Sequence, residues 1–180
     1  NVGILELGEF VNTSSNLKIT ELFLKAIFVY KKSNKINDEI LIVLEEAHIV
    51  APEQNFVSIN DNEAKASTQA ISQIALQGRK YGVGLLLISQ RTALVSKTIL
   101  SQCNTFFTFS LMDQTSLDFL KNFYGEAQIK IIPNLEKYHL ITHGVAIESE
   151  KPVIINTTDS NLDDDEMSKT KKVKDDDTMF

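Results

Sequence analysis

Helix-spaced and strand-like apolar patterns alternate along this chain. Apolar side chains that recur every three or four positions predict helices, and short aliphatic or alternating runs predict strands. The expected helices are residues 17–31, 64–80, 97–103 and 113–124, with a short helical segment at 127–132. The expected strands are residues 40–44, 84–89, 105–110 and 138–147. The two classes of element follow one another in turn, as they do in α/β proteins.

This alternation predicts the fold class. Strands separated by helices of this length form βαβ units, so we expect a mostly parallel sheet in a three-layer α/β domain. The run at 40–44 is apolar on both faces, which fits a central strand covered by helices on both sides. A length of 180 residues suits about one domain, and 43% hydrophobic residues suffice for a packed core.

The two ends of the chain differ from its body. The chain opens without Met or a signal-peptide pattern and reads directly into an alternating apolar segment at 2–7, so we expect a strand there and a chain that begins inside a larger domain. Residues 159–180 are rich in Asp and Lys and can bury little, which predicts a disordered tail. We therefore expect one domain over residues 1–158 and a tail over 159–180.

Charge and cysteine content exclude several functions. The formal net charge is −6, of which the eight acids and four lysines of the tail supply −4. The nearly neutral body excludes a polybasic nucleic-acid arm or a basic membrane-surface helix as the main function. Cys103 is the only cysteine, and no apolar run approaches the length of a membrane span, so we expect a soluble protein of a reducing compartment, the cytoplasm.

Two adjacent acids end the strand expected at 40–44. Ligands of α/β folds bind at the carboxyl ends of parallel strands, where Glu45 and Glu46 lie. One acid there can hold Mg²⁺, usually through water, and the next can polarise a water for attack on a γ-phosphate. The alternative is that both acids only end a strand and open a helix, whose dipole favours acids.

Two further polar segments flank the strand expected at 84–89. Residues 78–82 read Gly-Arg-Lys-Tyr-Gly, and a cation in such a turn, Arg79, can reach a neighbouring subunit and stabilise charge on a transferred phosphoryl group. Residues 89–91 read Ser-Gln-Arg, and the Gln90 amide can hydrogen-bond the attacking water or the γ-phosphate. Each segment has a plainer interpretation, a solvated helix end and a polar strand end.

Together these segments resemble the HerA/FtsK superfamily of hexameric pumping ATPases, and most closely the HerA-like DNA translocases. The resemblance rests on Glu-Glu-Ala-His at 45–48, the 78–82 turn, Ser-Gln-Arg at 89–91 and Leu-Ser-Gln-Cys-Asn-Thr at 100–105, and covers residues 1–157 in order. It implies a partial RecA-like P-loop NTPase fold that uses ATP and Mg²⁺.

The resemblance also implies a role for each site residue. Glu45 matches the Walker B acid that serves Mg²⁺, and Glu46 matches the catalytic glutamate. Arg79 matches the arginine finger that acts on the neighbour's nucleotide, and Gln90 matches the sensor glutamine. Arg91 is adjacent and is a candidate for the cation that reaches the nucleotide phosphate.

One departure of the chain from the family matters more than the others, such as Glu45 in place of the more widespread Asp. No Gly-x-x-x-x-Gly-Lys-Ser/Thr occurs, so the backbone cradle and lysine that hold nucleotide phosphates are missing, and we expect the chain by itself not to hydrolyse ATP. In the family this loop lies upstream of the strand expected at 2–7. A truncated sequence and a protein without the loop both explain its absence.

The resemblance implies a hexameric ring that moves along double-stranded DNA. Such motors often work with a nuclease, in DNA-end processing or in phage defence. Two alternatives stay open: a conjugation or secretion motor, and a non-catalytic ring or scaffold subunit that retains the fold. The polar loop at 52–63 either contacts DNA or is a surface loop.

Overall fold

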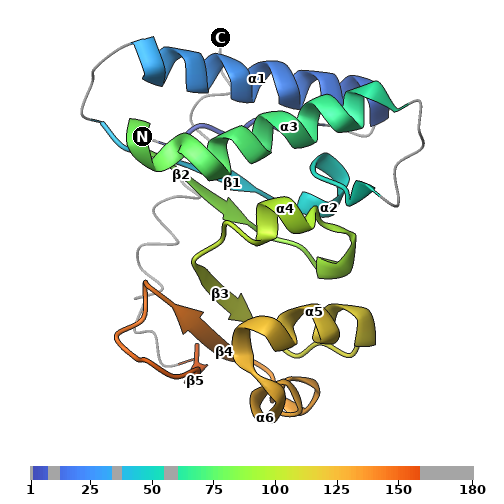
Figure 1. Ribbon diagram of the computed structural model, residues 1–180, viewed down its shortest axis with the longest axis vertical. Coiled ribbons are helices and arrows are strands. Elements are labelled where there is room, and N and C mark those ends of the chain that lie inside the picture. The colour runs from blue at the N-terminus through green and yellow to red at the C-terminus, as the bar shows by residue number, and fades with distance from the viewer. Residues whose placement is uncertain (1, 8–12, 34–37, 55–60, 159–180) are drawn as a thin grey trace, which may run out of the picture.

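The computed structural model describes residues 2–7, 13–33, 38–54 and 61–158 (Figure 1). The expected tail at 159–180 and the centre of the polar loop, residues 55–60, lie outside the described residues. Within the described chain no helix is long and apolar enough to cross a membrane.

A pair of parallel strands carries the amino-terminal half. Strand β1 (Ile40–Leu44) pairs with β2 (Val83–Leu87) in register from Ile40 opposite Val83 to Leu44 opposite Leu87. Helices α1 (Thr13–Ser33) and α3 (Asn62–Gln77) lie side by side over one face of this pair (Figure 1). The fold class, α/β with a parallel sheet flanked by helices, is confirmed.

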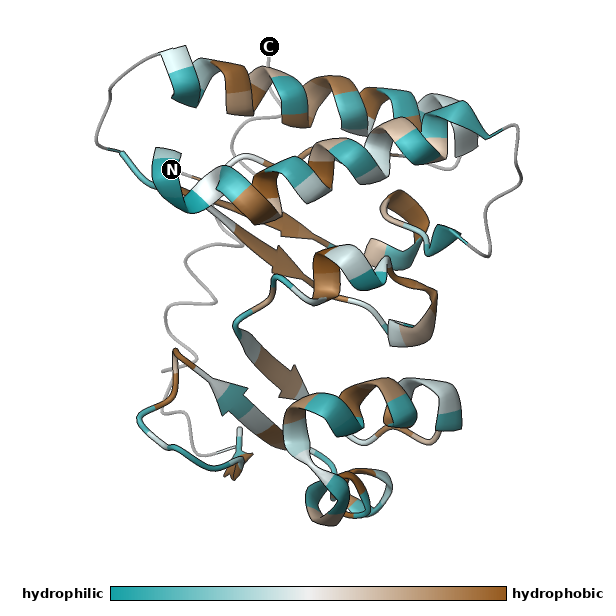
Figure 2. Ribbon diagram, viewed as in Figure 1, coloured by the Kyte–Doolittle hydropathy of each residue, from teal (hydrophilic) through white to brown (hydrophobic). Residues whose placement is uncertain are grey.

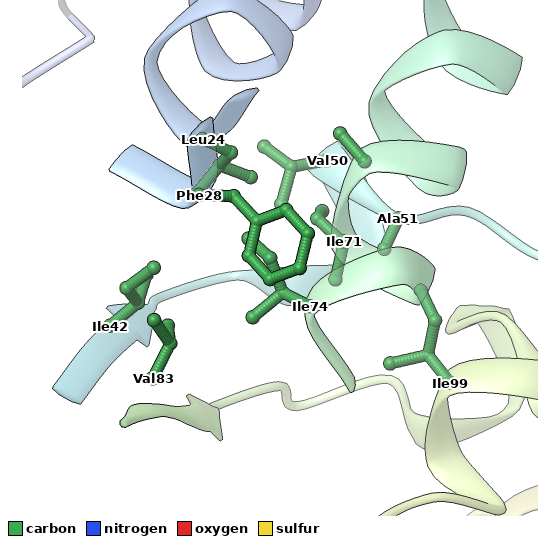
Figure 3. Close-up of a cluster of buried hydrophobic side chains, with 10 residues drawn as sticks. Leu24, Phe28, Ile42, Val50, Ala51, Ile71, Ile74, Val83 and Ile99 are labelled. Carbon is green, nitrogen blue, oxygen red and sulfur yellow. The ribbon is translucent and has the colours of Figure 1, made fainter. Parts of the chain in front are cut away.

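The core of this half lies between the two helices and the strands. Figure 3 shows Leu24 and Phe28 from α1 meeting Ile71 and Ile74 from α3 above β1 and β2. The strands add buried inward-facing side chains, such as Ile42 at 8% exposure. Burying an aliphatic side chain of this size stabilises the folded state by about 1.5–3 kcal/mol, so this cluster is the main reason that the helices stay on the sheet.

The opposite face of the parallel pair is largely open. Figure 2 shows both strands as strongly hydrophobic, yet Leu41, Val43 and Leu86 are 64%, 47% and 39% exposed. Successive side chains of a strand point to opposite faces, so the residues that alternate with the buried ones have no cover among the described residues. The expectation that helices cover residues 40–44 on both sides is therefore wrong for the described chain.

The carboxyl-terminal half contains a second, antiparallel sheet. Its strand order is β3 (Thr105–Thr108), β4 (His139–Gly144) and β5 (Val153–Asn156), and both pairings are antiparallel. Helix α5 (Gln114–Tyr124) packs Leu117, Leu120 and Tyr124 against Ile132 and Ile141. This half thus has a hydrophobic cluster of its own, below the parallel pair in Figure 1.

Short helical turns connect these elements. They are α2 (Ala47–Val50), η2 (Gly78–Tyr81), η3 (Thr92–Leu94), α4 (Lys97–Leu100), α6 (Glu126–Ile129) and η4 (Ile132–Asn134). Apart from the strand expected at 2–7, the helices and strands expected from periodicity are confirmed, with ends shifted by a few residues. The strand expected at 2–7 is wrong, because that segment pairs with no described strand and leaves Val2 93% and Ile4 84% exposed. Strand β5 was not expected from the sequence.

Candidate functional site

The carboxyl ends of β1 and β2 hold four of the five expected site residues: Glu45, Glu46, Gln90 and Arg91. Beyond the paired strands, the Ile88 amide donates a hydrogen bond to the Leu44 carbonyl at 2.9 Å, and the Ala47 amide donates to the Ile88 carbonyl at 2.9 Å. These two bonds continue the parallel pairing past the last strand residues. The segments after the two strands, residues 45–48 and 89–91, are therefore joined at one edge of the sheet.

Glu46 adopts an unusual backbone conformation at this edge. Its φ of 46° and ψ of 47° are left-handed, a region that few residues other than Gly enter. The turn from β1 into α2 requires it, and the Ile49 amide secures it by donating to the Glu46 carbonyl at 2.8 Å. The Glu46 side chain does not cap α2, so its carboxylate is left for other partners. Left-handed residues held in this way occur frequently at functional sites.

Two side chains contact the Glu46 carboxylate. The Gln90 amide nitrogen donates to Oε1 at 3.4 Å, and Nδ1 of His48 lies 3.2 Å from Oε2. Nδ1 of His48 also lies 3.3 Å from Oγ of Ser89. The Glu46 side chain is 45% exposed, so its carboxylate is held on two sides and is accessible to solvent.

Glu45 and Arg91 lie at the same edge and are exposed. The Glu45 carboxylate makes no hydrogen bond or ion pair with the described part of the chain. Residues 2–7, 13–33, 38–54 and 61–158 contain no group of three or more His, Cys, Asp or Glu that could hold a metal ion. A single exposed carboxylate still fits Mg²⁺, which is commonly bound through one or two carboxylates, several waters and the substrate phosphates.

Arg79 lies at the opposite end of the parallel strands, before the first residue of β2. It belongs to η2, which precedes β2, whereas Glu46 and Gln90 follow the strands. A five-residue strand spans roughly 16 Å at its usual rise, so the Arg79 backbone is well separated from the Glu46 edge. The expected residues therefore form two groups: Glu45, Glu46, Gln90 and Arg91 at the carboxyl edge, and Arg79 at the amino edge.

The turn that carries Arg79 is stabilised by a glycine cap and by an aromatic contact. Gly82 ends η2 with a left-handed φ of 66°, as expected for a glycine cap, and its amide donates to the Arg79 carbonyl at 3.3 Å. The Tyr81 ring meets Phe28 of α1 edge to face, with ring centroids 5.4 Å apart. Arg79 itself is exposed, so a rigid turn presents a cation to solvent.

A further set of contacts supports the carboxyl edge from behind. Pro52 and Val95 form an isolated antiparallel bridge, and the Ser96 amide donates to the Ala51 carbonyl at 2.9 Å. Oγ of Ser67 in α3 donates to the Val50 carbonyl at 2.7 Å in the protein interior. These contacts attach the segment after Glu46 to the rest of the domain and limit its movement.

Sequence reasoning missed two members of this cluster. Neither His48 nor Ser89 was among the site residues expected from the sequence. Their positions in Glu-Glu-Ala-His and Ser-Gln-Arg were the available signal. The contact between them required the two strand ends to be joined.

Comparison with known proteins identifies relatives of this chain. No family model matches it. It is 30% identical over 148 residues to the "Probable DNA double-strand break repair helicase HerA" of Methanocaldococcus jannaschii, which covers 81% of this chain and 26% of that protein. It is 36% identical over 81 residues to the "DNA double-strand break repair helicase HerA" of Pyrococcus furiosus, covering 45% of this chain and 13% of that protein.

A solved structure has a similar fold. The genome packaging NTPase B204 from Sulfolobus turreted icosahedral virus 2, in complex with ATP-gammaS, matches with a TM-score of 0.56 and 19% identity. The match covers 74% of this chain and 60% of that one. The chain thus spans only about a quarter of the first curated relative and three fifths of the structural neighbour.

Proposed function

Because the chain belongs to the HerA-like ATPases, we propose that the whole protein is an ATP-driven motor that moves along double-stranded DNA. The observation that carries this proposal is the convergence of Glu46 and Gln90 at the carboxyl edge of the parallel pair, 3.4 Å apart. Carboxylates and amides that meet at this edge can hold a water and a phosphate together. The motor is proposed to be a hexameric ring that acts in the cytoplasm with a nuclease as its partner.

Each site residue has a proposed task. Glu46 accepts a hydrogen bond from the attacking water and orients it, and Gln90 donates from its amide to that water or to the γ-phosphate. Glu45 would hold Mg²⁺ through water, and the ion would supply positive charge beside the nucleotide phosphates. Arg91 lies next to Gln90 and offers a second cation to the phosphates.

Arg79 is proposed to act on the nucleotide of the neighbouring subunit. Its position at the amino edge, a strand length from Glu46, supports action across a subunit interface instead of within one site. A guanidinium beside the transferred phosphoryl group offsets developing negative charge and is worth about 10³-fold or more in rate.

A non-catalytic ring or scaffold subunit is the second candidate. It is favoured by one observation, the absence of a Gly-x-x-x-x-Gly-Lys-Ser/Thr sequence, without which the nucleotide phosphates lack their usual site. In the motor, that loop is contributed by another part of the whole protein. The two candidates differ in whether the assembled protein turns over ATP.

ATP hydrolysis by the whole protein, with and without linear double-stranded DNA, tests the proposal. We expect DNA to stimulate turnover and Glu46→Gln to lower kcat by roughly 10²-fold or more. Glu136→Gln is the matched control, because Glu136 is an exposed acid in the carboxyl-terminal half and should have wild-type activity. An assembled ring that does not hydrolyse ATP would favour the scaffold. Wild-type turnover in Glu46→Gln would show that Glu46 is not a catalytic residue.

Mixed rings test the role of Arg79. Arg79→Ala alone should abolish most turnover, whereas Lys130→Ala, an exposed cation elsewhere, should not. If Arg79 acts across the interface, mixing inactive Glu46→Gln and Arg79→Ala subunits rebuilds some complete sites and restores partial activity. No recovery in assembled mixed rings would mean that Arg79 does not act on a neighbour.

A further inference from the structure

The side chains of Glu46 and Ser89 both contact the same ring nitrogen of His48. Nδ1 of His48 lies 3.2 Å from the Glu46 carboxylate and 3.3 Å from the Ser89 hydroxyl. The three residues come from the end of β1, from α2 and from the segment after β2, so they meet only in the folded chain. The imidazole is 18% exposed and therefore less free to move than the Glu46 side chain.

The hydrogen-bonding capacities of these groups make the two contacts different in kind. An ionised carboxylate only accepts, so it bonds Nδ1 only when that nitrogen carries a proton. A hydroxyl can also donate, so Ser89 can bond Nδ1 when the nitrogen presents its lone pair. In that second state the lone pair faces the Glu46 carboxylate and repels it.

Ser89 is already placed for the second state. Its Oγ accepts a hydrogen bond from the Arg91 amide at 3.1 Å, which leaves its own proton free to point toward Nδ1. The Glu46 backbone is restrained, because the Ala47 amide donates to the Ile88 carbonyl and the Ile49 amide donates to the Glu46 carbonyl. The freedom left to the Glu46 carboxylate is rotation of its side chain between His48 and open solvent.

We propose that His48 is a positioning residue: its Nδ1–H holds the Glu46 carboxylate in the orientation that binds the attacking water, and Ser89 competes for the same nitrogen. His48 touches neither the water nor the nucleotide and acts only through Glu46. The inference rests on the proposed function for its kinetic consequence, but the contact itself is testable without turnover.

Ring ¹⁵N NMR of the histidines tests the contact in the chain itself. In Glu46→Ala only Ser89 remains as a partner, so His48 should shift toward the form protonated on Nε2 alone. In Ser89→Ala only the carboxylate remains, so His48 should shift the opposite way, toward Nδ1–H. His139, whose Nδ1 contacts the Lys137 carbonyl, is the internal reference and should not change. Shifts in the same direction, or none, would overturn the inference.

Kinetics of the whole protein test the consequence. His48→Ala should lower kcat by roughly 10- to 100-fold with KM for ATP unchanged, since only orientation is lost. His48→Asn, whose amide can donate in place of Nδ1–H, should recover most of that loss. The control His139→Asn should match the wild type. An unchanged kcat in His48→Ala, or an equal loss in His48→Asn, would overturn the inference.

The two experiments separate the inference from the proposed function. If Glu46→Gln retains turnover while the NMR shifts are opposed, the contact stands and the role of Glu46 in hydrolysis is wrong. If Glu46→Gln is inactive but the His48 signals and kcat do not respond, the role of Glu46 stands and the inference about His48 is wrong.

Discussion

Replacing Gly78 by alanine tests how the turn that presents Arg79 is built. Gly78 is buried at the junction of α3 and η2, and a Cβ added to it would lie 2.4 Å from the Val83 carbonyl oxygen. Its φ of −55° and ψ of −42° are ordinary helical values, so the backbone conformation accepts any residue. The cost of the substitution is therefore the close approach between the helix end and β2.

The magnitude follows from that distance. Ordinary contacts of a Cβ begin near 3.4 Å, so helix and strand must separate by about 1 Å, and the atom met is backbone that a side-chain rotation cannot clear. Overpacking of this kind costs about 1–3 kcal/mol, and the upper part of that range applies here. The reduced entropy of the unfolded chain offsets about 0.4–1 kcal/mol, leaving a net loss of about 2 kcal/mol.

Thermal unfolding followed by circular dichroism measures this loss. For a chain of this size, about 2 kcal/mol lowers Tm by roughly 4–8 °C. Gly84→Ala is the matched control, because its Cβ would meet the Leu41 side chain at 3.2 Å, and that side chain is 64% exposed and can move. We expect the Gly84→Ala free energy of unfolding to stay within about 0.5 kcal/mol of the wild type.

The refuting result is equal behaviour of the two variants. If Gly78→Ala melts within a degree or two of both Gly84→Ala and the wild type, then the helix end can shift freely and does not fix the turn. The conclusion that a rigid turn presents Arg79 would then be wrong.

Three further predictions concern stability. Burial raises the pKa of Tyr124 to about 12, above its usual value of 10. The stability that the neutral phenol supplies is therefore full below pH 10 and is lost as the pH rises toward 12. In urea unfolding at pH 11.5, the free energy of unfolding should fall from its neutral-pH value by about 2 kcal/mol less in Tyr124→Phe than in the wild type. The Lys18 and Lys25 ammonium groups, 2.8 and 2.6 Å from the buried Glu21 carboxylate, lower its pKa, so its contribution is present at neutral pH and disappears as the pH falls through that lowered pKa. Glu21→Gln should therefore cost about 1 kcal/mol in urea unfolding at pH 7 and almost nothing in strong acid, and an equal cost at both pH values would contradict the pairing. Leu24→Ala, at a core position of α1, should lower the free energy of unfolding by about 3 kcal/mol in the same assay. Leu22 is 56% exposed on the same helix, so Leu22→Ala should lower it by less than about 0.5 kcal/mol. Similar losses in the two variants would contradict the packing of Leu24.

The local pattern of the sequence was sufficient to predict most of the elements. The aliphatic run at 40–44 became β1, and the helical spacing of residues 17–31 and 64–80 became α1 and α3. The meeting of Glu46 and Gln90 also followed from sequence, since parallel strands bring their carboxyl ends to one edge. Each of these outcomes depends on the spacing of apolar residues or on the direction of the chain, and both can be read from one segment of sequence without knowledge of its neighbours.

Other features could not be predicted because they depend on which surfaces meet. An apolar segment such as 2–7 carries the same alternation whether or not a neighbour pairs with it, and here it has no partner among the described strands. The expectation of a mostly parallel sheet did not hold for β3, β4 and β5, which pair antiparallel, because side-chain alternation is the same in parallel and antiparallel strands.

What the sequence by itself determined is therefore the order and type of most of the elements and the chemistry placed at their ends. What only the tertiary structure decided is how those ends meet: the left-handed turn at Glu46, the shared nitrogen of His48 and the separation of Arg79 from both. The physical reason is that periodicity is a property of neighbouring residues, whereas a hydrogen bond between Ser89 and His48 exists only after two strands have paired and fixed the distance between segments far apart in the chain.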